Sequence, residues 1–518
     1  MSAGEREERV EEQASTFAVH AACIRGVEAC PVTVEVAMAG GIPGMSIVGM
    51  ADAAVLEARS RIRCALRAGG FETPRRSITV CLAPADMRKT GSGLDLPIAV
   101  AVLAVSGQIP REGLDSCLFA GELALDGTVL AVKGEVAYQL LARDSGLSYI
   151  GGFAEGHVPI EGVDVGWIDR LGALRAGVAD ARRGFARPEV PPVPPDQRLD
   201  FSDVLGQEVA KRGITVAAAG GLGMLMIGPP GAGKTMLARR MTTILPPLEA
   251  AEQQEALRVH SVVGEPTAPL LAGERPFRSP HHSISAAGLV GGGSPVRPGE
   301  ISLAHGGVLF LDELAEFPAH TLQALRQPME EGSVRIVRAD GSYTFPSRFQ
   351  LLAASNPCPC GYLGDREIAC TCSEASIERY QSKLGGPLAD RIDLIVTVAR
   401  PDPDVIVNGE EGLSSADMRE QVVRARAFRA WREARRGPAE GGEGDGESLD
   451  TAVARFGFDG EGRSTLLSLA RRKHLTGRGI MRLCRIARTV ADMEEEPLIQ
   501  GRHVMEGSML QGRRVDER

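Results

Sequence analysis

The sequence predicts a multidomain protein with an α+β unit, a following α/β unit and a helical C-terminal part. At about 150 residues per domain, its 518 residues suggest three to four domains. Strand-like and helix-like segments alternate between residues 224 and 398, as is typical of an α/β domain. Residues 414–436 and 448–511 have helical patterns, and Ser414 with Asp417 has the spacing of a capping box.

The N-terminal part mixes both kinds of pattern, which favours an α+β domain. Residues 32–38 and 77–82 are β-rich, and residues 52–68 have helical periodicity. A proline-rich stretch at 188–195 predicts a stiff spacer. The predicted organisation is a disordered tail at 1–17, an N-terminal domain at 18–183, a linker at 184–198, an α/β core at 199–400, a helical domain at 401–511 with a flexible acidic insert at 437–447, and a tail at 512–518.

Composition narrows the class of protein. Hydrophobic residues make up 43% and charged residues 24%, as in globular proteins, and aromatic residues reach only 4%, which argues against a base-stacking module. No apolar run approaches the ~18 residues of a membrane span, and the N-terminus is polar and acidic, so we expect a cytoplasmic protein without a membrane partner. The net charge of −9 comes mainly from residues 1–12 and 437–450, so a nucleic-acid partner is not excluded.

A phosphate-binding loop is the strongest local signal. Residues 228–235 read GPPGAGKT, follow a predicted strand at 224–227 and precede a helical run. Glycines allow backbone N–H groups to surround phosphate oxygens, Lys234 is expected to reach the β- and γ-phosphates, and Thr235 to bind Mg²⁺. The predicted nucleotide-binding residues are Gly228, Pro229, Pro230, Gly231, Ala232, Gly233, Lys234, Thr235 and Asp312.

Two later strands end in polar residues suited to ATP hydrolysis. The apolar run 308–311 leads into Asp312 and Glu313. Asp312 fits an Mg²⁺-associated carboxylate, and Glu313 fits the group that orients or deprotonates the attacking water. Asn356 follows the run 349–355 and is placed to hold that water; a simple turn residue is the alternative. ATP and Mg²⁺ are therefore the predicted cofactors.

Four of the ten cysteines crowd into residues 358–372. Cys358 with Cys360, and Cys370 with Cys372, form two C-x-C pairs separated by nine residues. Four thiolates suit a tetrahedral structural Zn²⁺. The alternatives are four reduced thiols in a packed loop, or a redox role.

Several longer strings resemble the AAA+ ATPases of the magnesium-chelatase-like ComM/YifB family. They include 275–282 (RPFRSPHH), 297–305 (RPGEISLAH), 325–330 (LRQPME), 356–361 (NPCPCG) and 386–393 (GPLADRID). The N-terminal half matches through 41–44 (GIPG), 47–52 (IVGMAD) and 89–97 (KTGSGLDLP), so that the resemblance spans about 18–511.

The resemblance implies a homo-oligomeric ring, probably a hexamer, that couples ATP hydrolysis to movement along single-stranded or branched DNA. It implies a DNA-stimulated ATPase of helicase or branch-migration type, with a role in recombination or natural transformation. By carry-over, Arg391 looks like the arginine finger that reaches a neighbour's γ-phosphate. Arg478 looks like the sensor 2 arginine of a helical lid, although Gly477 precedes it where the family more often has alanine. A surface ion pair is the alternative for each.

A predicted hairpin at 333–347 carries the candidate DNA contacts Arg335 and Arg338, with Asp340 and Gly341 as its turn. In related AAA+ motors such a hairpin points into the pore, where arginines bind phosphates without reading sequence. Solvated strand residues are the alternative. Residues 281–297 are a second candidate pore loop, but at least one of His281 and His282 is expected to be a packing residue.

The N-terminal domain resembles the Lon protease C-terminal domain, of ribosomal S5 domain 2-like fold. A Ser–Lys protease needs a serine activated by a lysine. Ser92 lies near the serine's place, but an ungapped match puts Gly93 there; the lysine's place falls at Val136, and Lys133 lies three residues early. We therefore expect a non-proteolytic assembly or substrate-engaging module. A protein-remodelling ATPase, like the magnesium-chelatase motor subunit, and an ATP-dependent protease are the alternative functions.

Overall fold

The computed structural model describes residues 15–153, 160–184, 199–339, 341–365, 367–384, 388, 391–401, 403–408, 412–435 and 453–512. The predicted linker, acidic insert and C-terminal tail lie almost wholly outside this set, as does most of the N-terminal tail. Strand β1 already begins at Ser15, inside the predicted tail. Within the described part of the chain, no helix combines the length and the apolar character that crossing a membrane requires.

The chain forms two compact units. The first contains the N-terminal residues together with Leu257–Ala272 and Arg335–Phe345, which the sequence had placed within the core domain. The second contains the rest of the α/β core and the C-terminal helices. Long-range packing therefore assigns two segments of the predicted core to the N-terminal unit.

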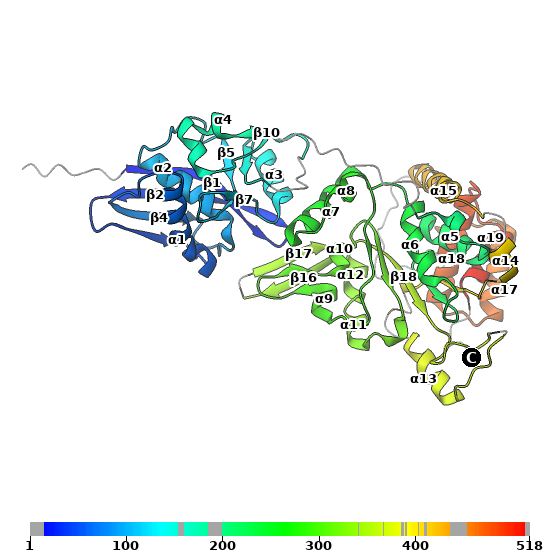
Figure 1. The fold of residues 1–518 in the computed structure, drawn as a ribbon. Coiled ribbons are helices and arrows are strands. Elements are labelled where there is room, and N and C mark those ends of the chain that lie inside the picture. Colours follow the sequence, from blue (N-terminus) through cyan, green and yellow to red (C-terminus); the bar gives the residue numbers. More distant parts are fainter. Residues whose placement is uncertain are drawn as a thin grey trace, which may run out of the picture. The chain divides into compact units, whose positions relative to one another are not determined.

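The first unit is built on a mixed eight-stranded sheet of order β10-β9-β8-β5-β1-β2-β4-β3 (Figure 1). Strands β1 and β2 form a long antiparallel pair from Ser15↔Met38 to Arg25↔Glu28. The strands are β1 Ser15–Arg25, β2 Glu28–Ala39, β3 Gly44–Val48, β4 Ser77–Ala83, β5 Cys117–Phe119, β8 Ser148–Gly151, β9 Val165–Trp167 and β10 Arg183–Gly184, with a separate pair β6 Glu122–Leu123 and β7 Val129–Leu130; the helices are α1 Ala53–Ala68, α2 Asp95–Val105, α3 Glu135–Asp144 and α4 Val178–Ala181.

Helix α2 forms the centre of this unit. All eleven of its residues are buried, which is why its sequence, DLPIAVAVLAV, is apolar almost all round. Asp95 is the exception, and Arg61 of α1 holds its two carboxylate oxygens at 2.6 and 2.9 Å. Burial raises the pKa of Asp95, and the Arg61 hydrogen bonds oppose that shift. The mixed sheet with covering helices confirms the predicted α+β class of this part.

The second unit contains a fully parallel five-stranded sheet of order β12-β15-β18-β11-β19. The alternation of strands and helices predicted from the sequence is confirmed. The strands are β11 Met224–Ile227, β12 Phe277–Arg278, β15 Val308–Leu311, β18 Gln350–Ser355 and β19 Leu394–Thr397, and a small pair is β13 Gly291–Gly292 with β14 Arg297–Pro298. The helices of the α/β part are α5 Glu208–Gly220, α6 Lys234–Ile244, α7 Ala250–Val263 (whose second half belongs to the first unit), α8 Ala268–Leu271 (in the first unit), α9 Ala286–Val290, α10 Glu300–Leu303, α11 Ala319–Gln323, α12 Arg326–Glu331, α13 Glu374–Leu384 and α14 Pro403–Asn408.

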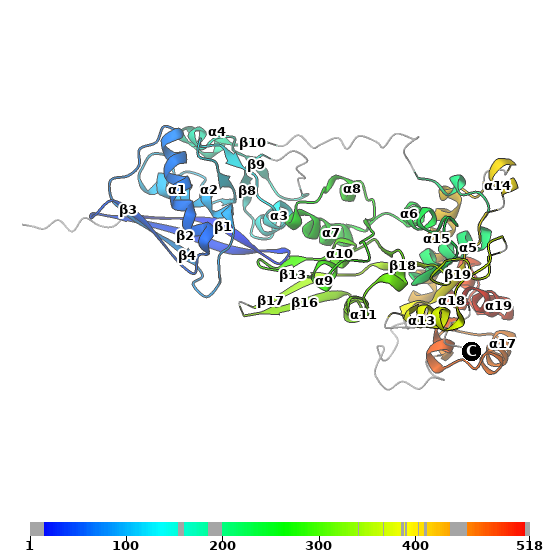
Figure 2. The ribbon, with the colours of Figure 1, turned by 60° about the horizontal axis from the view of Figure 1, so that its bottom comes forward.

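The C-terminal helices are α15 Ser415–Arg435, α17 Gly460–Arg472, α18 Gly477–Met493 and α19 Gly501–Leu510. Two of them, α15 and α18, pack against α5, while α19 packs against α18 and α17 (Figures 1 and 2). Ser414 and Asp417 exchange the hydrogen bonds of a capping box at the start of α15, as predicted. Arginines of α15 bind the backbone and α18: Arg426 donates to the Ala218 carbonyl oxygen, and Arg432 pairs with Asp492 at 3.0 Å.

Candidate functional site

The predicted phosphate-binding loop lies between β11 and α6, at the carboxyl end of a central strand. Gly231 and Gly233 adopt backbone φ values of 79° and 85°, which residues other than glycine rarely adopt. A Cβ on Gly228 would lie 2.1 Å from the Val398 carbonyl oxygen, so only glycine fits there. The loop therefore leads directly into the N-terminus of α6, the geometry that favours bound phosphate.

Lys234 is buried at the first position of α6. Its Nζ donates to the carbonyl oxygens of Gly228 and Pro229 at 2.7 and 3.0 Å, and to Oδ1 of Asn356 at 3.2 Å. Burial lowers the pKa of Lys234, while Asp312 and Glu313 act in the opposite direction. Residues 122 apart in the chain thus meet because β18 lies directly beside β11.

The two acids follow β15 at the same edge of the sheet. Thr235 donates its hydroxyl to Asp312 at 2.7 Å, so the two predicted Mg²⁺-associated side chains are in contact. Oxygen ligands of this kind, together with phosphate oxygens, are what Mg²⁺ prefers. The hydroxyl, the carboxylate, the ammonium and the helix N-terminus fit an Mg²⁺–nucleotide.

Glu313 has a left-handed backbone conformation, with φ of 53°. Such a conformation in a residue other than glycine is typical of constrained functional positions. One of its carboxylate oxygens lies 3.1 Å from Nδ1 of His282. The sequence analysis treated His282 as a weak DNA candidate or a packing residue and missed this contact.

Gln207 is a second residue that sequence reasoning missed. It stands just before α5 with φ of 61°, and its amide donates to the carbonyl oxygens of Ala232 in the phosphate-binding loop and of Ala399 after β19. The sequence did offer one signal for this residue: Gly206-Gln207 stands immediately before a helix, some twenty residues ahead of the phosphate-binding loop.

Arg391 does not lie at the phosphate-binding loop of its own chain. Arg391 comes just before β19, at the amino-terminal edge of the sheet, and pairs with Glu330 of α12. Arg485, two turns along α18 from Arg478, pairs with Asp393 at the same edge at 2.8 Å, and Arg478 itself is exposed at the start of the helix. The loop lies at the opposite, carboxyl-terminal edge.

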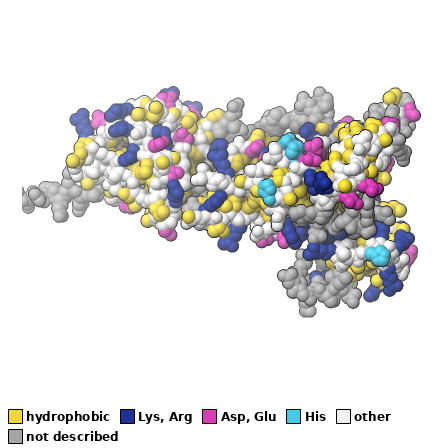
Figure 3. All heavy atoms as spheres, turned by 90° about the horizontal axis from the view of Figure 1, so that it is seen from below, with side chains coloured by type: hydrophobic (Ala, Val, Ile, Leu, Met, Phe, Trp, Pro, Cys, Tyr) yellow, Lys and Arg dark blue, Asp and Glu magenta, His cyan; other side chains and the backbone are white. Residues whose placement is uncertain are grey.

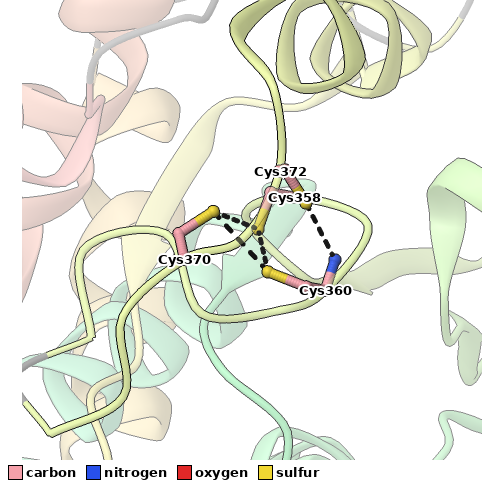
Figure 4. A group of neighbouring side chains, drawn as sticks. All are labelled: Cys358, Cys360, Cys370 and Cys372. Atoms are coloured by element: carbon pink, nitrogen blue, oxygen red, sulfur yellow. Dashed lines mark hydrogen bonds between the residues drawn. The ribbon is translucent and has the colours of Figure 1, made fainter.

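The four cysteines predicted to bind metal do come together. Figure 4 shows their sulfur atoms pointing toward one another from the two arms of one loop. Sγ of Cys358 lies 3.4 Å from Cys360 and 3.7 Å from Cys370, and all four sulfurs lie within 4.8 Å of one another. A tetrahedral site with Zn–S bonds of about 2.3 Å has sulfurs about 3.8 Å apart, so the cluster fits Zn²⁺.

The cysteine loop also packs against the nucleotide site. Gly361 follows Cys360 with φ of 87°, and a Cβ there would lie 2.6 Å from Cδ of Pro230 and 3.8 Å from Cγ of Asn356. The amide of Gln381 in α13 donates to the carbonyl oxygen of Pro357 at 3.1 Å. The loop thus supports both the phosphate-binding loop and Asn356.

Comparison with known proteins agrees with this arrangement. Three related family descriptions match successive parts of the chain: "Subunit ChlI of Mg-chelatase" at residues 34–150, "Magnesium chelatase, subunit ChlI" at 200–405, and "Magnesium chelatase, subunit ChlI C-terminal" at 412–511. The uncharacterized protein YifB of Escherichia coli K12 is 40% identical over 503 residues, which cover 94% of this chain and 95% of YifB. The chain belongs to the YifB/ComM family of magnesium-chelatase ChlI-like proteins.

Two further relatives show the breadth of this family. The competence protein ComM of Haemophilus influenzae is 37% identical over 515 residues, covering 94% of this chain and 96% of ComM. The magnesium-chelatase 67 kDa subunit of Heliobacterium mobile is 27% identical over 218 residues, covering 36% of this chain and 32% of that subunit. The ChlI family is a family of AAA ATPases, so ATP hydrolysis is implied for this member.

The predicted hairpin forms from β16 Ser333–Arg338 and β17 Gly341–Pro346; Asp340 of the predicted turn lies outside the described residues. Arg335 and Arg338 are both exposed. Because side chains alternate along a strand, they lie on opposite faces. Within the first unit, the Arg25 guanidinium lies over the Tyr343 ring at 5.4 Å, so one face of the hairpin meets the β1–β2 turn.

The residues compared with a protease do not form a Ser–Lys pair. The Ser92 hydroxyl donates to Glu122 at 2.5 Å, and a Cβ on Gly93 would lie 3.2 Å from the Tyr138 hydroxyl. The N–H of Val136 donates to the Ser261 hydroxyl at 3.3 Å. Lys133 precedes α3 and donates to the carbonyl oxygen of Val263.

Exposed basic residues around α17 form a further surface that the sequence analysis had not singled out. Figure 3 shows Lys and Arg side chains gathered over the lobe that this segment forms. The exposed arginines are Arg463, Arg471, Arg472 and Arg478.

We expect the purified protein to contain about one zinc per chain, and Cys370→Ser to lose it. Because Gly361 packs on Pro230, loss of the metal is also expected to weaken ATP binding several-fold. Metal analysis and titration with a fluorescent ATP analogue measure the two effects, with Cys64→Ser, an exposed cysteine of α1, as control. Protein prepared without chelator that carries no zinc would contradict the metal assignment.

Proposed function

We propose that this protein is a ring-forming ATPase that moves along DNA, of helicase or branch-migration type. The observation that carries the proposal is the meeting of Lys234, Thr235, Asp312, Glu313 and Asn356 at one edge of a parallel sheet. These groups suit the binding of the phosphates and Mg²⁺ and the activation of the attacking water.

Each residue has a distinct part in hydrolysis. The glycine loop and Lys234 hold the phosphates, and Thr235 with Asp312 holds Mg²⁺, which neutralises charge on the β- and γ-phosphate oxygens. Glu313 takes the proton of the attacking water, and Asn356 orients that water. The position of Asn356 against Lys234 supports its role, because the amide then faces the end of the phosphate chain.

We expect Lys234→Ala to lose productive ATP binding and Glu313→Gln to bind ATP without hydrolysing it. The first variant removes the ammonium from the phosphates; the second has an amide that cannot accept the water's proton. Binding is measured with a fluorescent ATP analogue and hydrolysis by phosphate release. Wild-type turnover by Lys234→Ala would contradict the site, and loss of binding in Glu313→Gln would indicate a structural residue.

The position of Arg391 supports ring formation. Arg391 stands at the edge of the sheet opposite its own phosphate-binding loop, which supports a role at the site of a neighbouring copy. A planar, permanently charged guanidinium suits the charge that develops on a transferring phosphoryl group. Arg478, at the start of α18, is the proposed sensor 2 arginine of the helical lid, and a ring of six chains brings Arg391 to the neighbour's site.

Arg391→Ala is expected to bind ATP and assemble, but to hydrolyse ATP about 10³-fold more slowly, as for other arginine fingers. Mixing Arg391→Ala with Lys234→Ala chains should restore part of the activity, because some interfaces then combine an intact Lys234 with an intact Arg391. The measurement is phosphate release at varied mixing ratios. No recovery in rings shown to be mixed would mean that Arg391 acts within its own chain.

DNA is the proposed partner along which the ATPase moves, because a full-length relative is a competence protein and because the hairpin exposes Arg335 and Arg338. Natural transformation and recombination are the proposed setting. Arg335 lies on the face away from Tyr343 and donates to Ser342 at 3.0 Å, so it is held where a phosphate backbone can approach it. Contacts of this kind bind without reading sequence.

Arg335→Ala is expected to weaken binding to single-stranded or four-way DNA and to reduce the salt dependence of the affinity, since each phosphate contact releases counterions. Arg338→Ala tests the opposite face, and Arg63→Ala, an exposed arginine of α1, is the control. Fluorescence anisotropy over a range of salt concentrations measures both affinity and slope. An unchanged slope in both hairpin variants would place the DNA elsewhere.

The N-terminal domain is proposed to be an S5 domain 2-like, Lon-related module without protease activity. The pairing of Ser92 with Glu122, and of the Val136 N–H with Ser261, supports this. The relationship to a magnesium-chelatase subunit makes protein remodelling the second candidate function. ATP hydrolysis that requires a partner protein and does not respond to DNA would favour remodelling. Cleavage of casein would favour a protease.

A further inference from the structure

His282 is the residue outside the predicted site that touches it most directly. Its Nδ1 lies 3.1 Å from a carboxylate oxygen of Glu313, and neither side chain is fully exposed. An ionised carboxylate only accepts hydrogen bonds, so Nδ1 is the ring nitrogen that would donate a proton to it. The contact therefore uses one carboxylate oxygen and leaves the other free.

The neighbouring His281 makes different contacts. Its Nδ1 accepts a hydrogen bond from the Ser283 N–H at 3.3 Å, so its proton is on the other ring nitrogen. The two rings lie 4.0 Å apart, and the Phe317 ring meets His282 edge-on at 6.4 Å. His281 is exposed and contacts Ser283 within its own loop, whereas the His282 ring nitrogen lies against the acid.

Strand register explains why these side chains meet. Strands β12 and β15 are parallel neighbours in which Arg278 is paired with Leu309. His282 follows Arg278 by four residues, and Glu313 follows Leu309 by four, so both emerge at the carboxyl edge. Arg278 is itself held by Glu300, at 2.6 and 2.9 Å. The end of β12, from which the chain leads to His282, is therefore held in place.

We propose that His282 is a positioning residue that orients the Glu313 carboxylate for its reaction with water, an inference that rests on the proposed role of Glu313 in ATP hydrolysis. A glutamate with a side chain 55% exposed has several accessible rotamers. The His282 contact at 3.1 Å selects one of them. As water attacks the γ-phosphorus and the bond to the ADP oxygen breaks, the free oxygen of Glu313 takes the water's proton, while His282 keeps its own.

The same contact links hydrolysis to a segment that reaches the surface. From His282 the chain continues through Ser285, which caps α9, to the small pair of β13 and β14, with an exposed turn at 293–295. This is the second candidate pore loop of the sequence analysis. A ligand that shifts this segment would shift His282, and with it Glu313.

The test compares three substitutions of His282 by steady-state ATPase kinetics. His282→Ala should lower kcat about 10- to 100-fold, the usual effect of removing a partner that orients a catalytic group, with little change in KM. His282→Asn should restore much of the rate, because its amide nitrogen takes the place of Nδ1. His282→Gln, whose amide reaches further, should not. His320→Ala, an exposed histidine of α11, is the control.

An unchanged or increased kcat in His282→Ala would overturn the proposal, as would equal rates in the Asn and Gln variants or a change confined to KM. Glu313→Gln, measured in parallel, separates this result from the proposed function. If Glu313→Gln hydrolyses ATP normally, the role of Glu313 itself is wrong. If Glu313→Gln is inactive and His282→Ala is normal, only the positioning role fails.

Discussion

The parallel pairing of β15, β18 and β11 is the constraint on which the candidate site depends. Because all three strands point the same way, the segments that follow them emerge together at one edge of the sheet. Asp312 and Glu313 follow one strand, Asn356 the next, and the phosphate-binding loop the third. Antiparallel pairing of β18 would carry Asn356 to the opposite edge, and Lys234 would lose that partner.

The cysteine loop extends this arrangement. It begins two residues after Asn356 and returns against Pro230, so a metal held by its four sulfurs would stiffen two parts of the nucleotide site at once. The close approach explains glycine at position 361, where the backbone conformation and the neighbouring proline both exclude a side chain. The link is mechanical: no cysteine needs to take part in the reaction.

A different constraint applies to Arg391, which lies at the amino-terminal edge of the sheet. Arg391 stands at the amino-terminal end of β19, far along the strand from its own phosphate-binding loop, and a long side chain does not alter which edge it leaves from. In the described structure Arg391 pairs with Glu330, an ion pair between partly exposed groups that is weak enough to exchange for a stronger partner. An exchangeable ion pair of this kind supports the proposed role of Arg391 at the site of a neighbouring copy.

The sequence alone determined the parts of the site that are contiguous in the chain. The loop at 228–235, the acids after an apolar strand and the two C-x-C pairs are local patterns whose chemistry follows from spacing, and resemblance to the YifB/ComM family identified the class of ATPase. Only the tertiary structure decided that β18 lies between β15 and β11, that His282 meets Glu313, and that residues 257–272 belong with the N-terminal unit. These facts depend on the order and register of strands that are far apart in the chain, and no local pattern of residues fixes them.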